Sequence, residues 1–435
     1  MTSRRRFLGA VGIPAVAAAA GVPILPVRLR ADARLREALA ARHASPGDAA
    51  EDEAFWGEVA RAFTVDRSLV NLNNGGVSPS PGFVQDAMKR HLDYSNEAPT
   101  YTMWRILEPQ REGVRQRLAR EWGVDPEEIA LTRNASESLQ ICQLGFDLER
   151  GDQVLTTSQD YPRMLTTFRQ RERREGIVLR EIAIPVPAED PAEVVRRFES
   201  AITPRTRLIL VCHMINLTGQ ILPVREIVAM ARRRGVPVIV DGAHALAHFD
   251  FRLSDLDCDY YAVSLHKWLF APHGTGLLYV RRDRIEGLWP LMAAPPEMNA
   301  DIRKFEEIGT HPAANFLAIG EALTFHQALG PNRKEARLVF LRDRWARRLL
   351  AREGFRLHTS LAPGRAAGIA TVEIEGVEPG ALTDWLWREH RIIVTPIVHP
   401  EFRGIRVSPS VYTMLEEIDR FAEAMERAAR EGLPA

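Results

Sequence analysis

The chain has 435 residues, and its 57 basic and 57 acidic side chains leave no formal net charge. With 46% hydrophobic residues it is long enough for one large and one small domain. The balanced charge makes nucleic acid a poor partner, and three cysteines without CxxC spacing provide neither a disulfide framework nor a metal site.

The first 27 residues differ in composition from the rest of the chain. Ser-Arg-Arg-Arg-Phe-Leu at 3–8 precedes an alanine-rich apolar run at 9–20. The run is too short and too weakly apolar to span a membrane, so we interpret residues 1–27 as a twin-arginine signal peptide. This interpretation predicts export of the folded protein by the Tat translocase to the periplasm or another extracytoplasmic space, with no stable membrane span.

Residues 28–70 indicate an N-terminal arm or surface helix, and a turn at 71–76 opens a large domain that extends to about residue 330. Strand patterns in this domain lie at 128–132, 153–157, 178–184, 207–213, 236–241, 260–264 and 276–281. Because helical patterns separate the first five, we predict an α/β fold with a mainly parallel seven-stranded sheet. Ligands then gather at the carboxyl ends of the strands. The last two strands have no helix between them, so we expect an antiparallel strand at one edge.

Residues 331–435 have a different character and indicate a smaller C-terminal domain. A long arginine-rich helix is expected at 334–353 and further helices at 379–389 and 415–431. Strand patterns occur at 369–374, 392–395 and 404–408. The combination predicts a compact α+β unit.

Lysine is scarce: it occurs only at positions 89, 267, 304 and 334, and arginine carries the remaining positive charge. A lysine amine can lose its proton and form a Schiff base, whereas an arginine guanidinium cannot. Lys267 follows a strand pattern and lies downstream of Asp241, which ends another strand. This pairing indicates pyridoxal phosphate as the cofactor, because a carboxylate keeps the pyridine nitrogen protonated.

Two more groups suit the same chemistry. Residues 132–137 (Thr-Arg-Asn-Ala-Ser-Glu) follow a strand and open a helix, so backbone N–H groups and the Ser136 hydroxyl can face a phosphate. Arg406 is the best candidate for a clamp on the carboxylate of an amino-acid or amine substrate. Each of these residues alone has an ordinary structural explanation, such as a helix cap or a surface charge. The order in which they occur along one α/β pattern is what supports pyridoxal phosphate binding.

Three motifs resemble a known family: Val-Asp-Gly-Ala-His-Ala at 240–245, Ser-Leu-His-Lys-Trp at 264–268 and Gly-Thr-Gly at 274–276. They are similar to the class V aminotransferase family of fold-type I pyridoxal phosphate enzymes, and within it to the isopenicillin N epimerase-like branch. The resemblance extends from about residue 70 to 430. It implies a large cofactor-binding domain, a small C-terminal domain, and a homodimer with a shared active site.

The resemblance also implies residue roles. Lys267 would form the internal aldimine and shuttle a proton at Cα, Asp241 would pair with the pyridine nitrogen, and His244 would contact the phenolic oxygen. Tyr161 would stack on the cofactor. Further cofactor contacts would come from Ala135, Ser136, Asn216, Ser264 and His266, and from Thr310 of a neighbouring subunit. Asn74 and Gly75 resemble the family's substrate-side turn.

The sequence leaves the reaction open between epimerisation, transamination and a β-lyase reaction at a C–S bond. Cysteine desulfurases of the family use a cysteine on a loop after the lysine, and no cysteine follows Cys258, which argues against that activity. An epimerase needs a second acid or base, for which Tyr161, His244, His273 and Tyr101 are candidates. A non-catalytic exported binding protein is the alternative that the presence of both Lys267 and Asp241 disfavours.

Overall fold

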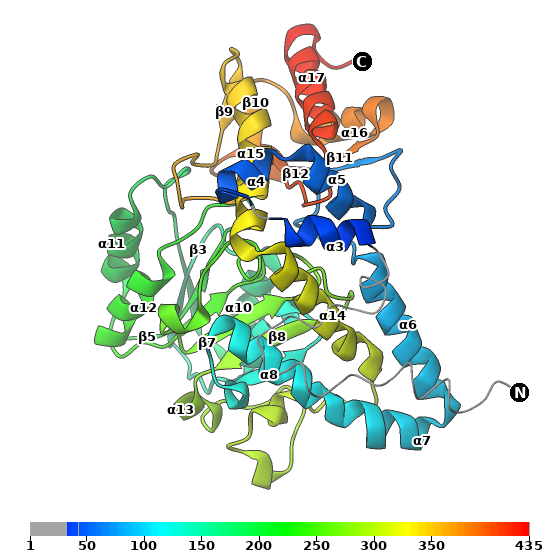
Figure 1. Ribbon diagram of the computed structural model, residues 1–435. Coiled ribbons are helices and arrows are strands. Elements are labelled where there is room, and N and C mark those ends of the chain that lie inside the picture. Colours follow the sequence, from blue (N-terminus) through cyan, green and yellow to red (C-terminus); the bar gives the residue numbers. More distant parts are fainter. Residues whose placement is uncertain (1–32, 42, 435) are drawn as a thin grey trace, which may run out of the picture.

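A computed structural model of the chain describes residues 33–41 and 43–434 (Figure 1). The predicted signal peptide lies outside the described residues. Among the helices of the described ranges, none combines the length and the apolar character needed to cross a membrane.

The largest sheet has seven strands in the order β2-β8-β7-β6-β5-β3-β4. Its strands are β2 (Ile129–Thr132), β3 (Gln153–Thr157), β4 (Val178–Ile182), β5 (Thr206–Cys212), β6 (Val238–Asp241), β7 (Tyr260–Ser264) and β8 (Gly276–Val280). Five of them pair in parallel from β7 to β4, whereas β8 is antiparallel to both of its neighbours. The prediction of a mainly parallel seven-stranded sheet is confirmed. The expected position of the antiparallel strand at an edge is wrong, because β2 adds outside β8 and takes the edge.

Both faces of this sheet are buried, which explains why its central strands are continuous apolar runs. Along β6, Val238 and Val240 belong to one hydrophobic cluster and Ile239 belongs to another. Successive side chains of a strand point to opposite faces, so the two clusters are the two sides of the sheet. The helices that follow strands β2 to β5 are α9 (Ala135–Gly145), α10 (Pro162–Glu175), α11 (Pro191–Ala201) and α12 (Val224–Arg233).

A second core lies towards the C-terminus, at the top of Figure 1. It is built on a four-stranded antiparallel sheet in the order β12-β13-β10-β9 and on a short parallel pair, β1 with β11. The strands are β1 (Val70–Asn71), β9 (Phe355–Leu357), β10 (Ala370–Ile374), β11 (Ile392–Ile393), β12 (Thr395–Val398) and β13 (Arg403–Val407). The strand expected at 392–395 is split, because its two halves pair with different partners. Helices α16 (Pro379–His390) and α17 (Leu415–Glu431) complete this part.

The remaining long helices are α6 (Gly82–Glu97), α8 (Arg111–Trp122), α14 (Ala313–Leu329) and α15 (Pro331–Leu350), with short helices α7 (Pro99–Tyr101) and α13 (Arg282–Ile285). The buried side chains of α6, α8 and α14 belong to the core of the large sheet, whereas α15 contributes buried side chains to both cores. The N-terminal helices α3 (Ala33–Ala40), α4 (Pro46–Glu51) and α5 (Glu53–Arg61) are anchored on α15. The fully buried Arg337 of α15 donates to the Ala50 carbonyl at 2.8 Å and to the Thr413 carbonyl at 3.2 Å. One helix therefore joins the N-terminal segment to the C-terminal core.

Candidate active site

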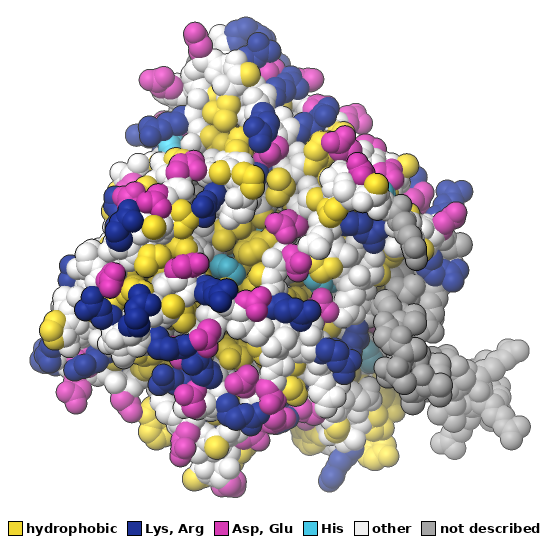
Figure 2. All heavy atoms as spheres, turned by 60° about the vertical axis from the view of Figure 1, so that its left-hand side comes forward, with side chains coloured by type: hydrophobic (Ala, Val, Ile, Leu, Met, Phe, Trp, Pro, Cys, Tyr) yellow, Lys and Arg dark blue, Asp and Glu magenta, His cyan; other side chains and the backbone are white. Residues whose placement is uncertain are grey.

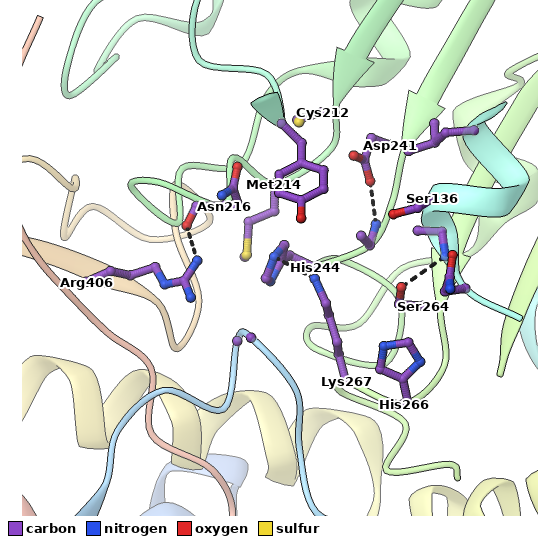
Figure 3. A pocket seen from close by; sticks show the side chains of 17 residues that line it. Ser136, Cys212, Met214, Asn216, Asp241, His244, Ser264, His266, Lys267 and Arg406 are labelled. Atoms are coloured by element: carbon purple, nitrogen blue, oxygen red, sulfur yellow. Dashed lines mark hydrogen bonds between the residues drawn. The ribbon is translucent and has the colours of Figure 1, made fainter. Parts of the chain in front are cut away.

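A cavity of about 290 Å³ opens at the carboxyl ends of the parallel strands, where α/β sheets bind ligands. The pairing register of the strands brings residues that are distant in sequence together in the walls of this cavity. Cys212 is aligned with Asp241 across β5 and β6, and Ser264 is aligned with Gly276 across β7 and β8. In Figure 3, Lys267 and His244 occupy the middle of the cavity, Arg406 enters from one side, and Ser136 and Ser264 lie on the other.

Lys267 and His244 form the central pair. The Lys267 Nζ atom lies 3.0 Å from His244 Nε2. Burial lowers the pKa of Lys267 to about 8, although the Asp241 carboxylate opposes this shift. Burial and the nearby cations Lys267 and Arg406 hold the pKa of His244 well below its usual value. The pair thus consists of a neutral imidazole and an amine that releases its proton close to neutral pH.

Asp241 is a buried carboxyl group whose Oδ1 accepts the Ala243 N–H at 2.9 Å. Burial raises the pKa of Asp241 to about 6, and the Ala243 hydrogen bond and the Lys267 charge oppose that rise. No salt bridge joins it to a cation within the described part of the chain. A carboxyl group in this state suits a protonated pyridine nitrogen, which would supply the missing positive partner.

The N-terminus of α9 forms a cradle for an anion. Asn134 caps the helix by accepting the Glu137 N–H at 2.8 Å, and the Ala135 N–H donates to Ser264 Oγ at 3.0 Å. Ser136 and His266 line the same end of the cavity. Because the helix dipole places partial positive charge at this end of α9, the cradle suits a phosphate.

Arg406 on β13 is a buried cation that faces the cavity. Its guanidinium donates to the Asn216 carbonyl at 3.0 Å and to Asn73 Oδ1 at 2.8 Å, and its Nε has no partner in the described structure. Burial lowers its pKa to about 10. No carboxylate of the described residues forms a salt bridge with Arg406, so the charge is free for an anionic ligand.

Most of the residues singled out from the sequence line this cavity. They are Ala135, Ser136, Tyr161, Asn216, Asp241, His244, Ser264, His266, Lys267, Arg406 and Gly75. Asn74 is not among the lining residues: it is buried, accepts from the Tyr412 hydroxyl at 2.6 Å and supports the turn that carries Gly75. Thr310 is exposed and also lies outside the cavity lining.

Two candidates for a second acid or base lie away from the cavity lining. His273 contacts the Ser78 carbonyl at 3.1 Å through Nε2, and Tyr101 is 61% exposed. Tyr161 and His244 both line the cavity. The geometry therefore reduces the four candidates to two.

Sequence reasoning missed several residues of the wall. Cys212 is buried and faces the cavity together with Met214. Asp160, the residue before Tyr161, is buried close enough to Cys212 and Asp241 to affect the pKa of both. The available signal was positional, because residues at the ends of neighbouring parallel strands share one edge of the sheet.

Comparisons with known proteins agree with this chemistry. The family model "Aminotransferase class-V" matches residues 70–421. An isopenicillin N epimerase of Streptomyces clavuligerus is 33% identical over 86% of this chain and 98% of that protein. A cysteine desulfurase of Synechococcus elongatus is 26% identical over 83% of this chain and 60% of that protein.

Among solved structures, a cystine C–S lyase in complex with its product cysteine persulfide has a TM-score of 0.73 and 25% identity, covering 84% of this chain and 98% of that one. The match supports the fold-type I architecture described above. The free carboxyl group of Asp241, the cradle at α9 and the Lys267 amine supply the groups that pyridoxal phosphate requires. The chain belongs to the class V aminotransferase family and is a pyridoxal phosphate-dependent enzyme.

Proposed function

We propose that the protein epimerises an amino acid at Cα and that this substrate carries a free α-carboxylate. The observation that carries the proposal is the placement of Lys267, 3.0 Å from a neutral His244, in a cavity that also contains the unpaired cation Arg406. Bound pyridoxal phosphate would act as an electron sink that makes the Cα–H bond acidic. The protein's task is then to orient the substrate and to move protons.

Two side chains are assigned to proton transfer in this proposal. Lys267, with its pKa of about 8, takes or returns the proton on one side of Cα. Tyr161 serves the other side: it lines the cavity, and its phenol lies within electrostatic reach of Arg406. His244 is less suited, because its neutral imidazole already contacts the Lys267 amine.

The only cysteine of the described cavity wall supports epimerisation over desulfuration. Burial and the carboxylates of Asp160 and Asp241 raise the pKa of Cys212 well above its usual value. The group therefore stays a thiol, whereas a sulfur acceptor must be a thiolate. The similarity to isopenicillin N epimerases over nearly their whole length points in the same direction.

The proposal is tested by incubating the holoenzyme with a panel of L- and D-amino acids in heavy water. We expect α-deuterium incorporation and loss of optical purity for one structural class of amino acid. Y161F should still exchange the Cα hydrogen of one enantiomer but should no longer invert it, whereas the control Y279F, on a tyrosine outside the cavity lining, should behave as wild type. Stoichiometric keto-acid formation, or exchange without inversion in the wild-type enzyme, would rule out epimerisation.

A C–S lyase is the second candidate, because the cystine C–S lyase shares the fold at 25% identity. Such a reaction needs Lys267 and a leaving group on Cβ but no second proton carrier. Cystine and S-substituted cysteines are the test substrates. Release of pyruvate and ammonia at a rate that Y161F leaves unchanged would favour the lyase.

We also propose that the enzyme is a homodimer with a shared site. Large apolar side chains are exposed at Val77, Tyr101, Trp104, Trp289, Leu291 and Met292, and an interface would bury them. Thr310 is exposed and lies outside its own subunit's cavity lining, so it is available to reach the phosphate of a partner.

We propose export by the twin-arginine route on the basis of residues 1–27. The route suits an enzyme that takes up its cofactor before it leaves the cytoplasm. Cell fractionation of the full-length chain should find the holoenzyme outside the cytoplasm, and replacing both Arg4 and Arg5 by lysine should retain it inside. A chain that fractionates identically with and without these substitutions would contradict the proposal.

A further inference from the structure

The turn that carries Lys267 connects β7 to β8 and contains a residue with an unfavourable backbone conformation. Phe270 has φ of 61°, in the left-handed region that is unfavourable for a non-glycine residue. Two backbone hydrogen bonds close the turn, from the Leu265 N–H to the Thr275 carbonyl at 3.0 Å and from the Ala271 N–H to the Leu265 carbonyl at 3.2 Å. Contacts from outside the turn must contribute to holding this conformation.

Lys334 of α15 supplies one such contact. It is 1% exposed, its Nζ donates to the Trp268 carbonyl, and the same atom lies 4.2 Å from the centre of the Phe270 ring. Lys334 forms no salt bridge with the described carboxylates, and burial holds its pKa well below the usual value. Burying an amine without a counter-charge is unfavourable, so its contacts with the turn have to compensate for the lost hydration.

His248 supplies the second contact. Its ring stacks on the indole of Trp268 with the ring centres 3.5 Å apart and the planes at 17°. The Gly368 N–H donates to His248 Nε2 at 2.9 Å, so the proton of the neutral ring is on Nδ1, which donates to the His244 carbonyl at 2.8 Å. One imidazole thereby contacts the residue after Lys267 and the backbone of His244.

The two contacts meet at Trp268, which is fully buried next to Lys267. Lys334 holds the Trp268 backbone and His248 holds its side chain, and His248 also fixes the segment that carries His244. The two cavity residues that lie 3.0 Å apart are thus attached to one buried support that does not itself line the cavity. We propose that Lys334 and His248 are positioning residues that set the geometry of the Lys267–His244 pair. The proposal rests on Lys267 being the lysine that binds the cofactor.

The chain contains a matched control for Lys334. Lys304 is 2% exposed, donates to the Asn299 carbonyl at 2.8 Å and lies 5.1 Å from the centre of the Phe305 ring. It therefore makes the same kinds of contact, with none of the residues that line the cavity. K334M and K304M both replace a buried, carbonyl-bonded lysine by a neutral side chain of similar length.

The experiment compares both variants with wild type as holoenzymes. The pH titration of the cofactor absorbance band and the kcat and KM of α-deuterium exchange are measured. For K334M we expect the titration midpoint to move by about half a pH unit or more and kcat to fall about tenfold, with KM nearly unchanged. K304M should alter only thermal stability. If K334M titrates and turns over like K304M, the proposal is overturned.

A pair of His248 variants gives an independent test. It also tests whether the support at Trp268 sets the geometry of the Lys267–His244 pair if K334M does not fold. H248F retains an aromatic ring against Trp268 but loses both hydrogen bonds, whereas H248N retains a donor near the His244 carbonyl. We expect the titration midpoint to shift in H248F and to recover in part in H248N. Identical midpoints in wild type, H248F and H248N would overturn the role of His248. A wild-type protein without an absorbance band would instead refute the cofactor role of Lys267.

Discussion

At the scale of single residues, burial shifts the pKa values of the cavity side chains away from those of the same groups in water. The pKa of Lys267 falls to about 8 and that of Asp241 rises to about 6, and loss of solvent is the largest cause of both shifts. An amine and a carboxyl group that each keep a proton accessible near neutral pH are typical of catalytic sites. Structural lysines on a protein surface have no such tuning.

The lowered pKa of Lys267 predicts how fast the cofactor-free protein takes up pyridoxal phosphate. Only the neutral amine reacts with an aldehyde, and it is the minor form below a pKa of about 8. The uptake rate should therefore rise about tenfold per pH unit up to pH ~8 and then level off. Stopped-flow absorbance measures this rate, and K267A should develop no band. A rate that continues to rise to pH ~10 would show an unperturbed lysine.

Arg406 predicts a defined loss of substrate binding. Removing a buried guanidinium that pairs with the substrate carboxylate should cost about 2–4 kcal/mol of transition-state stabilisation. This loss corresponds to a roughly 30- to 1,000-fold lower kcat/KM. R406A is compared with R403A on the same strand, where Arg403 is exposed and pairs with Glu378. Steady-state kinetics should show the loss for R406A alone. Equal kinetics in the two variants would place the substrate carboxylate elsewhere.

At the scale of elements, the phosphate cradle depends on how closely β8 approaches α9. A Cβ on Gly276 would lie 2.6 Å from the Asn134 Cα and 2.7 Å from its backbone nitrogen, so only glycine fits there without displacing the helix start. The edge strand β2 and the antiparallel strand β8 are thereby packed tightly at the point where the cofactor phosphate would bind.

G276A should consequently weaken cofactor binding. The added methyl group would displace Asn134 and disturb its cap and the Ala135–Ser264 hydrogen bond at the start of α9, where the phosphate would bind. Overpacking of this kind costs about 1–3 kcal/mol of stability. Equilibrium dialysis and thermal unfolding check both effects. G287A is the control, because a Cβ on Gly287 meets no atom within 4 Å. Unchanged affinity in G276A would mean that α9 does not bind the phosphate.

The sequence predicted well those elements whose secondary structure depends mainly on their own residues. The buried strands β6 and β7 are short runs rich in apolar and aromatic residues, and Asp241 and Lys267 could be placed at or just after their ends from that pattern. The position of β8 between β2 and β7 could not be predicted, because it depends on pairing between distant segments. The wall residues Cys212 and Met214 were missed because they become cavity residues only through the register of β5 and β6.

At the scale of the whole molecule, Arg406 and α15 connect the two cores. Arg406 extends from the small sheet to the Asn216 carbonyl of the large domain, and α15 contacts the N-terminal helices, the Lys267 turn and the C-terminal core. The cavity therefore depends on the relative placement of both cores. On the face seen in Figure 2, basic and acidic side chains are intermixed, in agreement with the zero net charge.

The proposed dimer predicts that one apolar surface side chain controls assembly and cofactor affinity together. L291E should dissociate the dimer in sedimentation velocity and weaken pyridoxal phosphate binding, because Thr310 no longer reaches a partner's cradle. V398E is the control, since Val398 is 79% exposed on the small sheet. T310A should weaken cofactor binding while the protein stays dimeric. A wild-type protein that sediments as a monomer would contradict the dimer.

The burial of lysines also has a practical consequence. Lys304 and Lys334 are buried and Lys267 lies in the cavity, so Lys89 on α6 is the one exposed lysine side chain of the folded protein. All three cysteines are buried as well. Amine-reactive dyes or resins should therefore attach to the native enzyme at Lys89, apart from the chain terminus, which gives a uniform conjugate and a fixed orientation on a surface without any engineered residue.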